Sequence, residues 1–492
     1  MATTHSPEDA IGSGGPLSQR TSQHLLRYLG LVTICAFYAR ALPGPFLPIV
    51  LMENFGQTAS TVGISIAAYP MAALVATPFA TKWVANSDNI FRTHSAAVMA
   101  MAIANASITC AVMVLNLGGP TLASAVILVS RSLQRIGFAL YMAAHTVLVT
   151  RVYPNDVAYI LALVEVFVGI GGQLGRLLGG VVYDHAGFEA PFLSIAIIQA
   201  VLACIGASVF AGQPIQSICG TRVEKQQAPT GAEEGVEPQP PRTAVRWCSL
   251  LLPRVLVGML AVLLTFFQVG FYDATLSPHL KQHLNLVTAT PISILMVLRS
   301  TSYLLSSLLC AELLKNRKVS LELLIVIGAS LCSVAWILIP PLQSIADLLE
   351  WALARSGRNG DEVLKYVSYL ALQVVALLIA SAGSALLFVP SLPLMQKGVR
   401  HLGQAAVEQT TALFMAMMSI GETLGPILGG WLTHTYGFQI ATMLAIIPYA
   451  SEAALATVNW DPHAVHSPLI SPGSQPVCDE DKNDNGTAYG SC

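Results

Sequence analysis

The sequence predicts an all-α membrane protein with 12 transmembrane helices in two six-helix pseudo-repeat halves. Three observations carry this prediction: hydrophobic residues make up 54% of the chain, apolar segments of membrane-spanning length can be read twelve times, and a glycine pattern in the fifth segment returns in the eleventh. Charged residues are only 11%, less than half of the roughly 25% that is typical of soluble domains. Because such a chain cannot cover a surface that faces water, we expect it to lie in a lipid bilayer.

Taken in order, the twelve apolar segments each have about the 20 residues that a helix needs to cross roughly 30 Å of hydrocarbon. A proline-containing polar stretch separates the sixth segment from the seventh and is typical of a linker. The expected organisation is an N-terminal tail (1–24), a first half (25–212), a linker (213–250), a second half (251–460) and a C-terminal tail (461–492). The expected spans are 27–51, 60–84, 95–116, 121–149, 157–182, 190–212, 253–276, 289–314, 320–341, 364–393, 404–433 and 437–459.

Basic residues indicate the orientation of these spans. Lysine and arginine gather at the N-terminus and in the even-numbered loops, for example at Lys82, Arg92 and Arg151, and are rare in the odd-numbered loops. Because basic loops stay on the cytoplasmic side, we expect both tails and the linker to be cytoplasmic.

The glycine pattern leaves one side of a span without side chains, so that another helix can approach it backbone to backbone. In the fifth span the pattern consists of Gly171, Gly175, Gly179 and Gly180. It returns 250 residues further along as Gly421, Gly425, Gly429 and Gly430. The constant offset indicates two halves of one plan, as in secondary transporters whose halves rock around a site at the membrane midplane.

Ionisable side chains inside spans are candidate functional residues, because the bilayer makes them costly. Asp273 and Glu165 lie in opposite halves and could both face a central cavity. Desolvation disfavours the charged form of a carboxylate, so either residue could hold a proton or an ammonium group in turn, as an antiporter requires. The alternative for each is a carboxylate tied to a nearby arginine for packing.

The basic residues of the spans complicate this picture. Arg131 and Arg135 are four residues apart on one helix face. Arg176 shares a face with Glu165, but about 16 Å of helix separates them. Glu422 lies within the second glycine pattern, where a packing role is favoured over a place in the cavity.

Positively charged side chains outnumber negatively charged ones within the spans. Five arginines, at 40, 131, 135, 176 and 299, stand against the acidic residues at 165, 273, 312 and 422. If several of these arginines face the cavity, an organic anion is the better expectation for the substrate. The sequence shows no catalytic motif, metal-ligand cluster or nucleotide-binding loop in a suitable context, so we expect no enzyme activity, no cofactor and no metal.

Several motifs resemble those of a known family. The fourth span reads Arg131-Ser-Leu-Gln134-Arg135-Ile-Gly-Phe-Ala, similar to an RxxQGxGxA signature, and the eleventh span matches GxxxGPxxGG with Pro426 at the proline position. The fifth span has Arg176 at that position. Together these motifs resemble proton antiporters of the major facilitator superfamily. The runs Glu165-Val-Phe and Gly-Phe-Tyr-Asp273 are similar to its vesicular amine and polyamine transporter branch.

The resemblance implies proton-coupled antiport of a small organic cation, an amine or polyamine, by alternating access, with Arg131 in proton coupling. Ala36 and Met415 stand where monoamine carriers have aspartates, which favours the polyamine member. The alternatives are a facilitator or symporter of an organic anion or drug-like solute, and a non-transporting sensor of the same fold. The expected partners are a small-molecule substrate, protons and the lipid bilayer, without nucleic acid. We expect a monomer, in an intracellular vesicle or vacuole membrane rather than the plasma membrane.

Overall fold

The computed structural model describes residues 16–153, 157–210, 250, 252–284, 286–315, 319–340 and 362–458. In this part of the chain every regular element is a helix. The N-terminal half comprises α1 (Pro16–Ala41), α2 (Leu47–Glu53), α3 (Ala59–Ala85), α4 (Ile90–Ser107), α5 (Cys110–Val152), α6 (Val157–Ala186), α7 (Glu189–Ile205) and the π-helical turn η2 (Gly206–Phe210). The C-terminal half comprises α9 (Pro253–His283), α10 (Thr290–Lys315), α11 (Leu321–Leu338), α13 (Glu362–Val399), η4 (Arg400–Leu402), α14 (Gln404–Tyr436) and α15 (Phe438–Val458).

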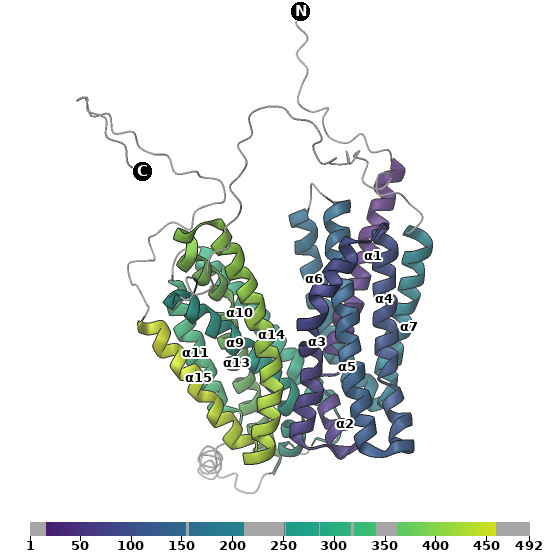
Figure 1. Cartoon of the computed structure of the whole chain (residues 1–492). Coiled ribbons are helices and arrows are strands. Elements are labelled where there is room, and N and C mark those ends of the chain that lie inside the picture. Colours follow the sequence, from purple (N-terminus) through teal and green to yellow (C-terminus); the bar gives the residue numbers. More distant parts are fainter. Residues whose placement is uncertain are drawn as a thin grey trace, which may run out of the picture.

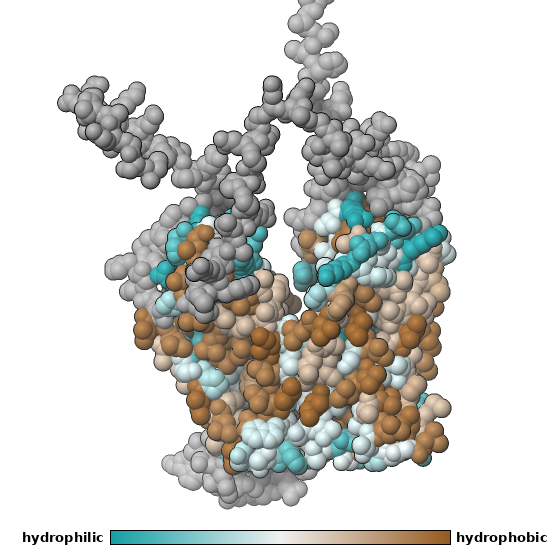
Figure 2. All heavy atoms as spheres, in the orientation of Figure 1, coloured by the Kyte–Doolittle hydropathy of each residue, from teal (hydrophilic) through white to brown (hydrophobic). Residues whose placement is uncertain are grey.

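Ten helical segments of the described residues are long and apolar enough to span a membrane. Together with the more polar α1 and α4 they make up the predicted twelve, so the all-α, twelve-helix fold class is confirmed. On the face seen in Figure 2, apolar residues form a band across both halves, and polar residues gather towards its upper and lower edges. Most of the predicted linker and tails lies outside the described residues, although α1 already begins at Pro16, within the stretch assigned to the tail.

Two predicted spans differ in outline from the helices observed. The first expected span, 27–51, is broken after Ala41, because Pro43 and Pro45 lack the amide hydrogens that a continuing helix needs. The third, 95–116, is interrupted by a turn between α4 and α5. α5 then bends at Gly119, where φ is 77°, immediately before Pro120. Prolines thus account for the end of α1, and glycine with proline accounts for the bend in α5, whereas the turn between α4 and α5 contains neither residue.

The halves lie side by side and touch through only a few helices (Figure 1). α3 packs on α14 and α6 packs on α10, with smaller contacts of α9 with α2 and α3. A cleft separates the halves at the upper end of the view and closes towards the lower end (Figure 2). Lys82, Arg92 and Arg151 lie at helix ends on the open side.

The two glycine patterns build equivalent contacts in the two halves. A Cβ atom added to Gly171, Gly175 or Gly179 would collide with carbonyl oxygens at the C-terminal end of α1 and just beyond it, and one added to Gly421 or Gly425 with carbonyl oxygens of α9. The fourth glycine of each pattern contacts the opposite half instead. Gly180 lies against Ala289 and Ser293 at the start of α10, and Gly430 lies against α3. Each pattern therefore joins two helices within its half and then touches the other half.

Candidate functional site

Charged side chains from both halves converge on the cleft near the middle of the long helices. Arg40 of α1 donates a hydrogen bond from Nη2 to Glu422 Oε1 of α14 at 2.8 Å, so this ion pair joins the halves. Arg299 of α10 approaches Asp273 of α9 within 3.8 Å. The Asp273 side chain remains 39% exposed, whereas that of Arg299 is only 10% exposed. The second pair is therefore looser than the first, and its carboxylate remains open to the cleft.

Arg131 and Arg135 of α5 gather around one aromatic ring. The guanidinium carbon of Arg131 lies 4.7 Å from the ring centre of Tyr69 on α3, and that of Arg135 lies 5.2 Å from the same centre. Arg135 also lies 5.4 Å from the ring of Phe138. Such cation–π contacts stabilise a guanidinium without neutralising it. No carboxylate in the described part of the chain forms an ion pair with either arginine.

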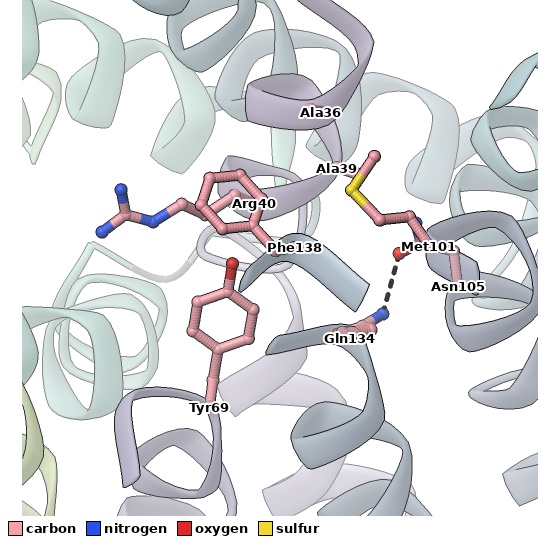
Figure 3. A pocket seen from close by; sticks show the side chains of 8 residues that line it. All are labelled: Ala36, Ala39, Arg40, Tyr69, Met101, Asn105, Gln134 and Phe138. Carbon is pink, nitrogen blue, oxygen red and sulfur yellow. Dashed lines mark hydrogen bonds between the residues drawn. The ribbon is translucent and has the colours of Figure 1, made fainter. Parts of the chain in front are cut away.

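A small cavity lies behind Arg40, within the N-terminal half (Figure 3). Its volume is about 10 Å³, close to the least that admits a water molecule. Figure 3 shows Arg40 and Tyr69 on one side of it and the amides of Asn105 and Gln134 on the other. The lining residues are Ala36, Ala39, Arg40, Tyr69, Met101, Asn105, Gln134 and Phe138. The cavity therefore connects the charged cluster with polar groups buried inside the half.

Arg176 belongs to the same cluster, but Glu165 lies apart from it. The Arg176 guanidinium interacts electrostatically with Arg299, Asp273 and Arg40, and its Nη1 donates only to the carbonyl oxygen of Gly172, at 3.3 Å. Glu165 is exposed and has no hydrogen bond or ion pair with the described residues. Because it lies about 16 Å from Arg176 along α6, it is nearer the open end of the cleft.

At the closed end, further polar contacts bridge the halves. Asp184, near the C-terminus of α6, accepts hydrogen bonds from the backbone N–H groups of Ala289 (2.8 Å) and Thr290 (2.7 Å) at the start of α10. The Thr290 hydroxyl donates to the same carboxylate at 2.5 Å. Lys281 of α9 forms an ion pair with Glu53 of α2. The cleft is thus accessible from one end and blocked by specific contacts at the other.

Sequence reasoning named Arg131, Arg135, Arg176, Asp273 and Glu422, and the structure brings all five into one cluster. It does not bring Glu165 there. Sequence reasoning missed Tyr69, and it also missed the buried amides of Asn105 and Gln199. Polar side chains within apolar spans were the available signal for these amides. For Tyr69 no signal was available, since a tyrosine in a membrane helix is common.

A helix bundle of two halves with a charged cleft between them is typical of membrane transporters, and the comparisons with known proteins identify a transporter and not an enzyme. The family model of the Major Facilitator Superfamily matches residues 29–407, and the chain belongs to that family. The chain is 25% identical over 449 residues to the MFS-type transporter SLC18B1 of Rattus norvegicus, covering 88% of this chain and 86% of the relative. The Mus musculus protein of that name is 25% identical over 454 residues, covering 90% and 88%.

Solved structures support the same fold. A bacterial homolog to the human lysosomal transporter Spinster, in an inward-facing and occupied conformation, matches with a TM-score of 0.63 at 13% identity, covering 89% of this chain and 98% of that one. The nucleoside transporter NupG matches with a TM-score of 0.63 at 13% identity, covering 88% and 98%. At these identities the likeness concerns the fold alone.

Proposed function

We propose that this transporter moves a small organic anion through the cleft by alternating access. The observation that carries the proposal is the excess of cations in the cluster. Two of its arginines have carboxylate partners, Glu422 and Asp273, whereas Arg131, Arg135 and Arg176 have none among the described residues. The cluster therefore has three uncompensated positive charges when all its groups are ionised.

Uncompensated arginines at membrane depth need an anion or water nearby, because the low dielectric strengthens like-charge repulsion. A substrate with negative charge would reduce that repulsion on entering the cleft. A polyamine would increase it. We infer that electrostatics favours anion binding here, although the sequence motifs resemble those of amine carriers.

The arrangement of the arginines favours a substrate with two acidic groups. A guanidinium presents paired donors that match a carboxylate or phosphate. Arg131 and Arg135 come from adjacent turns of α5, and Arg176 comes from α6. Dicarboxylates and organic phosphates are the simplest small molecules that could meet donors from both helices.

We further propose a cytoplasmic position for both termini and for the open end of the cleft. The basic loops support this orientation, because Lys82, Arg92 and Arg151 all lie at that end. The closed end would then face the lumen of a vesicle or vacuole, with a monomer as the transporting unit and protons as the coupling ion.

Proton-coupled antiport of an amine or polyamine is the second candidate. The exposed fraction of Asp273, 39%, favours it, since an accessible carboxylate could bind an ammonium group or a proton in turn. Arg131 would then take part in proton coupling. In this case Asp273→Asn should abolish gradient-driven amine accumulation while folded protein is retained, and fully pH-driven uptake by the variant would remove Asp273 from the mechanism.

The test is uptake by the purified full-length protein in proteoliposomes with an acidic interior. The probes are radiolabelled succinate, glucose 6-phosphate, spermidine and serotonin, each measured with and without the pH gradient. We expect uptake of an acidic probe and none of the amines. Uptake of spermidine or serotonin alone would overturn the anion proposal, and transport of no probe from a wider panel would favour the sensor alternative.

Arg176→Gln and Arg135→Gln sharpen this test. Each should raise the apparent KM for the transported anion about tenfold or more, the scale of one hydrogen bond to a charged group. Arg151→Gln is the matched control, because Arg151 lies exposed at the end of the helix that carries Arg135. If Arg176→Gln instead lowers the KM for an amine, the cleft selects cations. If it reduces the amount of folded protein, Arg176 has a structural role.

A further inference from the structure

We propose that Asn105 and Gln199 are positioning residues for Arg131, acting through a chain of side-chain amides inside the N-terminal half. The proposal rests on the proposed function in one respect only, the part it gives Arg131 in substrate binding. Neither residue belongs to the charged cluster of the cleft. Gln199 lies on α7, which packs on α1, α4 and α6 and has no substantial contact with the C-terminal half.

This chain of amides consists of four hydrogen bonds that lead from Arg131 to the backbone of α1. Arg131 Nη1 donates to Gln134 Oε1 at 2.7 Å, and Gln134 Nε2 donates to Asn105 Oδ1 at 3.0 Å. Asn105 Nδ2 donates to Gln199 Oε1 at 2.7 Å, and Gln199 Nε2 donates to the carbonyl oxygen of Cys35 at 3.3 Å. All three amide side chains are buried, at 6% exposure or less.

The hydrogen bond to α1, at one end of the chain of amides, determines the direction of each of the other hydrogen bonds. A backbone carbonyl can only accept a hydrogen bond, so Gln199 must turn its nitrogen towards Cys35 and its oxygen towards Asn105. The same requirement passes to Asn105 and then to Gln134. Gln134 is thereby held with its oxygen towards Arg131, as a guanidinium requires. Without this anchor an amide could rotate and present its nitrogen to the cation, which would repel it.

The anchor matters because Arg131 has little else to hold it. It is 6% exposed, forms no ion pair with the described residues and leaves its Nε without a hydrogen-bond partner. Among the described residues, the Tyr69 ring and the Gln134 amide are the groups in direct polar contact with its guanidinium. Linked hydrogen bonds polarise one another in a medium of low dielectric. We therefore expect the chain to determine where this guanidinium lies relative to the cleft.

The C-terminal half provides a matched control. Tyr449 of α15 lies 250 residues beyond Gln199, and its hydroxyl donates to the carbonyl oxygen of Leu264 on α9 at 2.6 Å. This bond, like that of Gln199, joins the last helix of its half to the first. It has no connection to Arg131. Tyr449→Phe thus removes an equivalent packing bond without altering the amide chain.

The experiment measures the reactivity of individual arginines in the full-length protein. Phenylglyoxal is added to proteoliposomes that contain the wild type, Asn105→Leu, Gln199→Leu or Tyr449→Phe, and mass spectrometry of peptides follows its reaction with Arg131, Arg135 and Arg176. We expect Arg131 to react about tenfold faster in Asn105→Leu, the scale of one hydrogen bond to a charged group. The increase should be smaller in Gln199→Leu and absent in Tyr449→Phe.

Two results would overturn the inference. One is an Arg131 rate that is the same in all four proteins. The other is a parallel rise at Arg135 and Arg176, which would indicate general loosening of the half. Because labelling requires no substrate, its outcome stands even if the succinate and glucose 6-phosphate assays show no transport. Where one of these anions is transported, Asn105→Leu should raise its KM more than it lowers kcat.

Discussion

The N-terminal and C-terminal halves share one helical scaffold but carry different chemistry on it. Their glycine contacts are equivalent, since Gly175 lies against Tyr38 of α1 as Gly425 lies against Phe267 of α9. The charges are divided, however. Four of the five clustered arginines belong to the N-terminal half, and both clustered carboxylates belong to the C-terminal half. One half thus supplies most of the positive charge and the other all of the negative charge, so attraction across the cleft depends on how closely the halves approach.

Arg176 and Pro426 show how this difference arose at a single position of the repeat. Pro426 lies where α14 packs on α9 and α3, and a Cβ added to Gly63 of α3 would collide with its carbonyl oxygen. Arg176, 250 residues earlier, extends into the charged cluster. The same position serves helix packing in one half and the site in the other. A repeat therefore predicts the backbone better than it predicts the chemistry.

The largest expected effect tests the shared scaffold. Gly175→Leu and Gly425→Leu should each greatly reduce folded protein and block transport, because a side chain would occupy the space of the Tyr38 or Phe267 carbonyl. Overpacking of a tight contact typically costs roughly 1–3 kcal/mol or more. Fluorescence-detected size-exclusion chromatography and thermal unfolding would measure the loss.

Gly169→Leu is the matched control on α6, because a Cβ there would meet no atom within 4 Å. Comparable losses at positions 175 and 425 would support equivalent packing in the two halves. Wild-type yield and transport in both variants would show that these contacts are not tight, and a loss in only one would show that the halves differ in packing as well as charge.

A moderate effect should separate contacts within a half from contacts between halves. Asp184→Ala removes the carboxylate that accepts three hydrogen bonds from the start of α10, while the packing within each half is unchanged. We expect near-normal folding but a shift of about tenfold or more towards states with the closed end open, the scale of a charged hydrogen bond.

Spin labels at the lower ends of α6 and α10 would report that shift as a longer distance by electron paramagnetic resonance. His185→Ala is the control. The His185 side chain is next to Asp184 in the sequence, but it is exposed and hydrogen-bonds only to the Val181 carbonyl oxygen of its own helix. An unchanged distance distribution in Asp184→Ala would mean that the small-residue contacts alone hold this end closed.

Much of the fold could be predicted from the sequence, but only part of the site. The offset of 250 residues predicted two halves, and hydrophobicity predicted the twelve spans, since both patterns repeat along the chain. The sequence could also show that Arg131 and Arg135 share a face. It could not show that Tyr69 lies beneath both guanidiniums, because helical periodicity gives the direction of a side chain but not the identity of the helix opposite.

Glu165 and Glu422 also show what can and cannot be predicted from the sequence. Both are glutamates within a span, and a packing role was favoured for Glu422. Glu422 forms an ion pair across the cleft at 2.8 Å, whereas Glu165 lies exposed and without a partner in the described part of the chain. What separates them is depth in the cleft and the presence of Arg40 on another helix. Those are properties of three-dimensional packing, which a single sequence does not record.

The smallest effect concerns the second polar bridge at the closed end. Lys281 and Glu53 join the halves, but the Glu53 side chain is 51% exposed, so water competes with the ion pair. Exposed pairs contribute roughly 0–1 kcal/mol. Glu53→Gln should therefore change the population of states with the closed end open by a few-fold at most. The change should be smaller as salt concentration rises, because salt screens exposed charges.

Measuring the distance distributions of Glu53→Gln and Asp184→Ala singly and together gives the coupling between the two bridges. If Glu53→Gln opens the closed end as much as Asp184→Ala does, the greater burial of the Asp184 bridge is not what holds this end closed.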